Sequence, residues 1–84
     1  MKESKLPPQL TWREFVRVLE ALGYQAMKSK RGSARSFHSK TRSPAVVTFH
    51  EPHGKDPIRE GTLREYLRKL QLGRDEFLEL LERG

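Results

Sequence analysis

The chain has 84 residues and a formal net charge of +6, and 35% of its residues are hydrophobic while 33% are charged. This length supports one modest hydrophobic core and is too short for a second. The absence of cysteine excludes disulfides and thiolate metal sites, and no apolar run is long enough for a membrane span or a signal peptide. We therefore expect a cytoplasmic protein that does not associate with membranes.

The first segment, residues 1–10, contains Pro7-Pro8 and no hydrophobic periodicity. It predicts an extended leader that contacts the rest of the chain through Leu6 or Leu10. We expect residues 11–84 to form a single domain. Its first element is a helix, because Thr11-Trp12-Arg13-Glu14 has the form of a capping box and apolar residues follow at helical spacing as far as Gly23.

Three short segments with strand character come next, at residues 24–30, 34–39 and 45–50. The expected tight turn between the first two is Arg31-Gly32-Ser33, in which Gly32 can adopt a positive φ. Residues 40–44 form a loop before the third strand.

Alternation assigns side chains to the two faces of these strands. In the second strand Phe37 should face the core, and Ala34 and His38 should point the other way. In the third strand Val47 and Phe49 should share one face.

After the third strand, Pro52 and Gly54 predict a loop that continues through residues 56–60. Thr62-Leu63-Arg64-Glu65 has the form of a second capping box, and the helix it begins should break at Leu72-Gly73. A short amphipathic helix should follow from Asp75 to Leu81. The order α-β-β-β-α with an added C-terminal helix predicts an α+β fold like that of double-stranded-RNA-binding domains (dsRBD-like), with helices on one face of a three-stranded antiparallel sheet.

The positive charge is concentrated in the middle of the sequence. Residues 24–60 carry a net charge of +5, whereas residues 1–23 carry +1 and residues 61–84 carry none. Between Lys28 and Arg42 there are six Lys or Arg and no Asp or Glu. A localised positive field attracts phosphates, so we expect an anionic polymer as the partner, with a plain solvated surface as the alternative.

Several motifs in a specific order resemble the HicA family of toxins, small mRNA interferases of bacterial toxin–antitoxin systems. They are an opening helix that ends in Leu22-Gly23, a Gly32-Ser33 turn, the segment from Phe49 to Lys55 with sequence FHEPHGK, and Gly61-Thr62-Leu63 at a helix start. The resemblance covers Trp12 to about Leu81. It implies a dsRBD-like fold, RNA cleavage without a metal or other cofactor, and neutralisation by a HicB-type antitoxin.

One position departs from the family pattern. Members with established activity carry a histidine directly after the Gly-Ser turn, where it is taken to be catalytic, and here that position is Ala34. An alanine cannot transfer a proton. The resemblance therefore implies an endoribonuclease whose active site differs from that of typical members.

Three histidines are the candidates for acid–base catalysis of RNA cleavage, because the pKa of imidazole lies near working pH. His38 lies on the predicted face of Ala34 but about 13 Å farther along the strand, since each strand residue advances about 3.3 Å. His50 and His53 are the better candidates. Each of the three has the alternative of a structural role at a strand end or in a loop.

Basic and hydroxyl side chains around the turn and loops are the candidates for binding RNA phosphates. They are Lys28, Lys30, Arg31, Ser33, Arg35, Lys40, Arg42 and Lys55. His50 and His53 also suggest a metal site, but their spacing around a proline lacks helical geometry and only Glu51 and Asp56 lie nearby, so we expect none.

Two alternatives to an mRNA interferase follow from Ala34. The first is a catalytically inactive RNA-binding module that keeps the fold and the positive charge. The second is a protein-interaction domain whose basic face binds an acidic partner.

Overall fold

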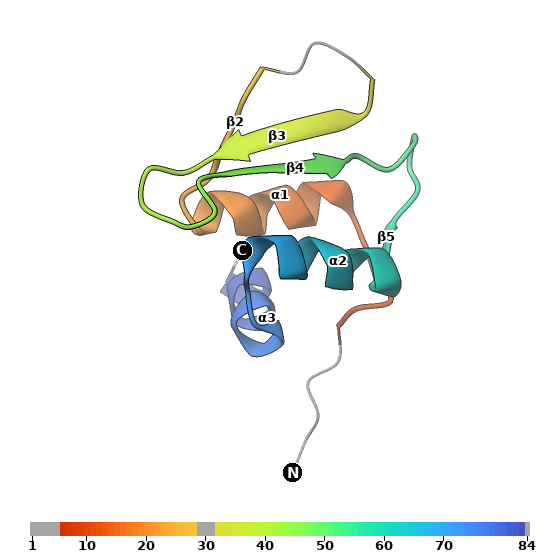
Figure 1. Ribbon diagram of the computed structural model, residues 1–84. Helices are drawn as coiled ribbons and strands as arrows, with labels where there is room; N and C mark the ends of the chain where they lie inside the picture. The colour runs from red at the N-terminus through yellow and green to blue at the C-terminus, as the bar shows by residue number, and fades with distance from the viewer. Residues whose placement is uncertain (1–5, 29–31, 84) are drawn as a thin grey trace.

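The computed structural model describes residues 6–28 and 32–83. The helices are α1 (Trp12–Ala21), α2 (Glu60–Leu70) and α3 (Arg74–Arg83), and the strands are β1 (Gln9–Leu10), β2 (Gln25–Ala26), β3 (Ala34–His38), β4 (Val46–His50) and β5 (Ile58–Arg59). β2, β3 and β4 form an antiparallel sheet in that order, and the helices lie on one side of it (Figure 1). The predicted α+β fold with the order α-β-β-β-α and a C-terminal helix is confirmed.

The start of α1 follows the predicted capping box. The Thr11 hydroxyl accepts from the Glu14 N–H at 3.1 Å, and the Glu14 carboxylate accepts from the Thr11 N–H at 3.0 Å. Together these bonds satisfy two of the N–H groups that a helix start leaves unpaired. The helix is followed by Gly23 at a φ of 101°, where a side chain would be strained, so the predicted stop is also confirmed.

The hairpin of β3 and β4 has the predicted alternation. Val47 and Phe49 are buried against the helices, whereas Val46 and Thr48 are exposed on the other face. Gly32, in the turn before β3, has the expected positive φ of 53°. The sheet therefore has one face in the core and one face free of covering elements among the described residues.

The strand predicted at residues 24–30 is shorter than expected. In the structure β2 covers only Gln25–Ala26, although the Met27 N–H still donates to the Ser36 carbonyl at 2.8 Å. The physical reason is that residues 25–28 are all exposed, so little burial favours a longer strand, whereas Tyr24 before them is buried and donates its hydroxyl to the Pro44 carbonyl at 2.6 Å. Residues 29–31 lie outside the described residues.

The loop predicted at residues 56–60 is confirmed only as far as Pro57, and the capping box predicted at Thr62 is wrong. Ile58–Arg59 forms β5, which pairs with β1, and α2 begins at Glu60 with Arg59 as an N-cap that makes no side-chain capping bond. Glu60 is itself in the first turn, where it suits the helix dipole, and it forms an ion pair with Arg64 one turn on. A two-residue strand leaves no pattern in the sequence, which is why β5 was not foreseen.

The core lies between the sheet and the helices. Phe15 of α1 packs edge-on against Phe49 of β4 with ring centroids 5.1 Å apart, and Tyr66 of α2 lies 4.7 Å from the Phe49 ring. Leu6 and Leu10 are also buried, so the N-terminal segment contacts the core as expected. The break between the last two helices covers residues 71–73, so it includes the predicted Leu72-Gly73, and it begins at Gln71, which has a φ of 55°. No helix in the described part of the chain is long and apolar enough to cross a membrane.

Candidate functional site

His50 stands at the end of β4, directly across the hairpin from Ala34. Its Nδ1 lies 3.3 Å from the Ser33 hydroxyl, and the next residue, Glu51, donates its N–H to the Ser33 carbonyl at 2.8 Å. These contacts hold the turn before β3 against the end of β4. The exposed imidazole is therefore oriented by a neighbour and open to a ligand.

Ala34 occupies the position directly opposite His50 in the antiparallel pair. Side chains directly opposite each other in an antiparallel pair have Cβ atoms about 4.5–5.5 Å apart. A side chain longer than alanine at residue 34 would therefore contact the imidazole of His50.

Arg35 connects the same turn to the loop after β4. Its Nε donates to the Glu51 carboxylate at 2.9 Å, and its Nη1 donates to the Gly32 carbonyl at 2.8 Å and the Ala34 carbonyl at 3.1 Å. Arg35 was predicted to bind RNA phosphates. In the structure these donors are directed at the protein's own turn and loop.

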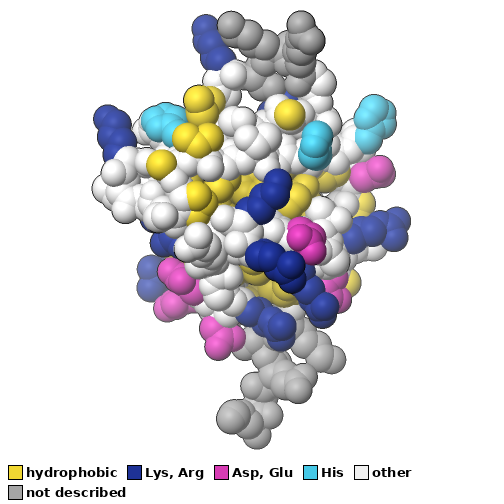
Figure 2. All heavy atoms as spheres, in the orientation of Figure 1, with side chains coloured by type: hydrophobic (Ala, Val, Ile, Leu, Met, Phe, Trp, Pro, Cys, Tyr) yellow, Lys and Arg dark blue, Asp and Glu magenta, His cyan; other side chains and the backbone are white. Residues whose placement is uncertain are grey.

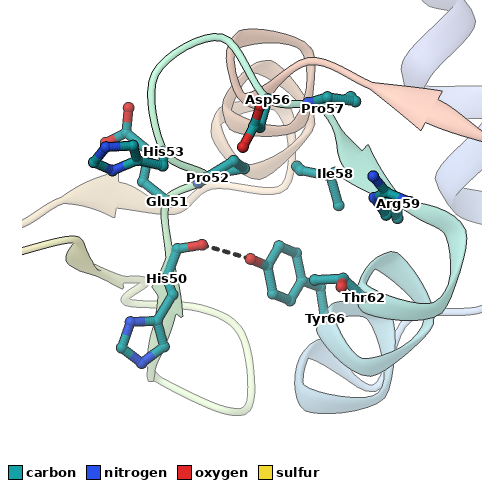
Figure 3. Close-up of a pocket in the computed structure, with 10 residues that line it drawn as sticks. All are labelled: His50, Glu51, Pro52, His53, Asp56, Pro57, Ile58, Arg59, Thr62 and Tyr66. Atoms are coloured by element: carbon teal, nitrogen blue, oxygen red, sulfur yellow. Dashed lines mark hydrogen bonds between the residues drawn. The ribbon is translucent and has the colours of Figure 1, made fainter.

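His53 and His50 border a hollow of about 370 Å³ between the loop after β4 and the start of α2 (Figure 3). The two histidines lie on one side of this hollow, and Arg59 and Thr62 lie on the other side. A second, adjoining hollow is lined by Ser33, Arg35 and again His53. The loop that carries His53 therefore forms the ridge between the two hollows.

Tyr66 of α2 is hydrogen-bonded to the main chain of His50. Its hydroxyl donates to the His50 carbonyl at 2.6 Å, as the dashed line in Figure 3 marks. Burial raises the pKa of the Tyr66 hydroxyl above its ordinary value of 10.0. Because the hydroxyl stays protonated, this bond fixes the end of β4 on α2 throughout the neutral range.

His38 is not brought to this site. It pairs with Val46 and Gln25 at the opposite end of the hairpin. Four strand residues separate it from Ala34, which is about 13 Å. The structure thus groups His50 and His53 and leaves His38 apart.

The other basic side chains predicted to bind RNA are spread over three segments. Lys28 is exposed after β2, Lys40 and Arg42 lie in the loop between β3 and β4, and Lys55 is exposed in the loop after β4. Arg42 is half-buried, and its backbone N–H donates to the Ser39 hydroxyl at 3.1 Å. The predicted residues Lys30 and Arg31 lie outside the described residues.

The sequence interpretation missed the basic side chains of α2. Arg64, Arg68 and Lys69 are exposed on this helix, and Arg59 precedes it. The net charge of zero over residues 61–84 hides this signal. The residues of α2 carry a net charge of +1, with Arg64, Arg68 and Lys69 against two glutamates, and the residues of α3 carry −2.

Within residues 6–28 and 32–83, no group of three or more His, Asp or Glu side chains is placed to hold a metal ion. The chemistry available at the site is that of imidazole, hydroxyl, guanidinium and carboxylate groups.

Comparison with known proteins places residues 12–72 in one family model, described as the HicA toxin of bacterial toxin–antitoxin systems. This match spans more than half of the chain, from α1 through the end of α2. No curated protein and no solved structure matches the chain.

Proposed function

The chain belongs to the HicA toxin family of bacterial toxin–antitoxin systems, and on that premise we propose that it is an mRNA interferase that cleaves RNA at the end of the β3–β4 hairpin where Ala34 pairs with His50. A HicB-type antitoxin would neutralise it by covering this end of the molecule. The observation that carries the proposal is the juxtaposition of Ser33, His50 and position 34.

His50 is the residue we assign to proton abstraction. In the tautomer with its proton on Nδ1, the imidazole donates to the Ser33 hydroxyl, and Nε2 is then left with a lone pair. Nε2 takes the proton of an RNA 2′-OH while that oxygen attacks the adjacent phosphorus. The bond to the 5′-oxygen breaks, which leaves a 2′,3′-cyclic phosphate on one fragment.

The leaving 5′-oxygen needs a proton, and His53 is the candidate donor. It is exposed on the same side of the hollow as His50 (Figure 3). A protonated imidazole at His53 would supply the proton and carry positive charge near the developing phosphorane. After the cleavage step, His50 therefore carries the proton taken from the 2′-OH, and His53 has given its proton to the 5′-oxygen.

This assignment accounts for Ala34. The usual histidine of the family would stand beside His50, within contact distance across the strands. His50 is therefore close enough to act at the same phosphate as a histidine at position 34 would.

The test is induced expression without an antitoxin, followed by RNA analysis. We expect growth arrest, loss of mRNA, and fragments with 2′,3′-cyclic ends that form in the presence of EDTA. The purified protein should release the same fragments from a model mRNA. Good expression of soluble protein with neither toxicity nor RNA loss would contradict the proposal.

A second candidate function is RNA binding without cleavage, and Ala34 is the observation that favours it. In that case RNA is retained at low salt and released at high salt while its length stays unchanged. The variant Ala34→His separates the two functions. If the site is otherwise intact, the added imidazole beside His50 should produce or increase cleavage.

A further inference from the structure

The open face of the sheet contains no Lys or Arg among its described strand residues. Its outward side chains are those of Gln25, Ala34, Ser36, His38, Val46, Thr48 and His50. Met27, next to Ser36 across the strands, adds a side chain that is 42% exposed, and Val46 is 55% exposed. This face offers hydroxyl, imidazole and apolar groups, and its described strand residues carry no ammonium or guanidinium group to attract phosphates.

Positive charge gathers on α2 instead. We call the side chains of Arg59, Arg64, Arg68 and Lys69 the α2 basic face; all four are exposed. Figure 2 shows dark blue side chains collected over the position that α2 occupies in Figure 1, with cyan imidazoles above them. Four acidic residues lie on α3, which packs against α1, whereas Glu60 and Glu65 lie on α2 beside the basic side chains.

The α2 basic face is joined to the strand that carries His50. Lys69 donates from Nζ to the Thr48 carbonyl at 2.9 Å and lies 5.7 Å from the centroid of the Phe49 ring. Tyr66, one turn earlier, donates to the His50 carbonyl. The outer edge of β4 and the side of α2 are therefore one continuous surface that starts at His50.

Two cations of this face, Arg64 and Arg68, are available to a ligand. Arg68 makes no ion pair with any described residue. Arg64 pairs only with Glu60, and both side chains are more than 40% exposed. An exposed pair of this kind contributes little, so exchanging the carboxylate for a phosphate costs little.

We infer that the α2 basic face binds the phosphate backbone of the RNA strand whose cleavage site lies at His50, so that the strand leaves the hairpin across β4 and α2 rather than along the open sheet face. This inference rests on the proposed function and specifies the RNA path at that same site. The contacts are with phosphates, so binding should be strongly salt-dependent and nearly independent of base sequence.

The test measures binding to a fluorescent single-stranded RNA with 2′-O-methyl groups, which cannot be cleaved through the 2′-oxygen. Fluorescence anisotropy over a series of salt concentrations compares the wild type with Arg64→Gln/Arg68→Gln. Losing two phosphate contacts should reduce the slope of log K against log salt by about 1.4 and weaken binding about 20-fold at 0.1 M salt.

Two further variants make this result specific. Arg64→Lys/Arg68→Lys keeps the charge and should keep the wild-type salt slope. Arg13→Gln/Arg83→Gln removes the same charge from α1 and α3, and it also includes one arginine of an exposed i,i+4 pair, Arg83 with Glu79. Its salt slope should be that of the wild type. Circular dichroism and thermal unfolding check that all variants are folded.

The outcomes separate the two proposals. If the wild type binds RNA and the α2 variant has an unchanged salt slope, the α2 path is overturned while RNA binding stands. If the control variant loses as much as the α2 variant, the effect is one of net charge, and the path is again overturned. If the wild type does not bind RNA at low salt, both proposals fail.

Discussion

The open sheet face and the α2 basic face both border His50, yet they differ in chemistry. The sheet face is made of short polar and apolar side chains, whereas the α2 basic face is made of exposed arginine and lysine. The sequence placed its largest excess of charge in residues 24–60, which include all three strands of the sheet. Charge that is dense along a segment therefore need not be dense on the surface that the segment forms.

The physical reason lies in the two periodicities. In β3 and β4 the residues between the buried positions are mostly small or neutral, and Arg35 is the one arginine or lysine of these two strands. Lys28, Lys40, Arg42 and Lys55 lie outside the strands, in connecting segments. In α2 the buried leucines occupy one stripe, and the remaining positions collect the cations on the solvent side. The helix thus brings Arg64, Arg68 and Lys69 to its exposed side, next to Glu60 and Glu65, whereas the cations of the hairpin segment are dispersed.

The largest effect should come from the residue where the two faces meet. We expect His50→Gln to reduce RNA cleavage by about 10²- to 10⁴-fold, because it removes the general base. RNA affinity should change little, since the phosphates are held elsewhere. A cleavage assay with a labelled RNA and an anisotropy titration measure the two quantities separately.

His38→Gln is the matched change at the far end of the sheet face. It should leave the cleavage rate near that of the wild type, because His38 pairs with Val46 and lies about 13 Å from Ala34 along the strand. A loss of cleavage as large as that of His50→Gln would place the active site nearer His38 and contradict the role assigned to His50.

Arg35→Gln tests whether Arg35 stabilises the turn and the loop or binds RNA phosphates. Because Arg35 donates to Gly32, Ala34 and Glu51, its loss should lower the free energy of unfolding by about 1 kcal/mol and reduce cleavage. The salt slope of RNA binding should stay unchanged. A slope reduced by about 0.7 would instead show that Arg35 contacts a phosphate.

Tyr66→Phe should loosen the connection between β4 and α2. It removes the hydrogen bond to the His50 carbonyl, which should lower the free energy of unfolding by about 1 kcal/mol in urea titrations. Tyr24→Phe removes a similar bond, to Pro44, at the other end of the hairpin and is the matched control. Only the Tyr66 variant should also lower cleavage.

The raised pKa of Tyr66 predicts that the stability of the protein depends on pH. Burial raises the pKa of Tyr66 in the folded state, so folding favours its protonated form. Its contribution is complete below the unfolded pKa of about 10 and is lost as the pH rises above that value. The stability of the wild type should therefore fall more steeply above pH 10 than that of Tyr66→Phe. Parallel slopes would exclude this contribution.

The smallest effect should come from the open sheet face. Val46→Thr and Met27→Gln replace exposed side chains, so each should change the free energy of unfolding by no more than about 0.5 kcal/mol. Neither should alter the salt slope of RNA binding. If either variant weakened RNA binding markedly, the open sheet face would also belong to the RNA path.

Much of the fold could be predicted because it depends on local patterns. The Thr11 capping box, the stop at Gly23 and the alternation around Phe49 are each contained in a few neighbouring residues, and the structure confirms all three. Pairing over long distance was missed. β5 forms only because Ile58 and Arg59 meet Leu10 and Gln9, almost fifty residues earlier, and no pattern within two residues indicates this.

The candidate site divides in the same way. The sequence by itself determined the histidines, the Gly-Ser turn, the alanine at position 34 and the family resemblance, because these are matters of residue type and order. Only the tertiary structure decided which of them meet. The hairpin register brought His50 to Ser33 and Ala34 and left His38 at the other end. The tertiary structure also places the cations of α2 and most acidic residues of the C-terminal part on different helices, although the net charge of residues 61–84 is zero.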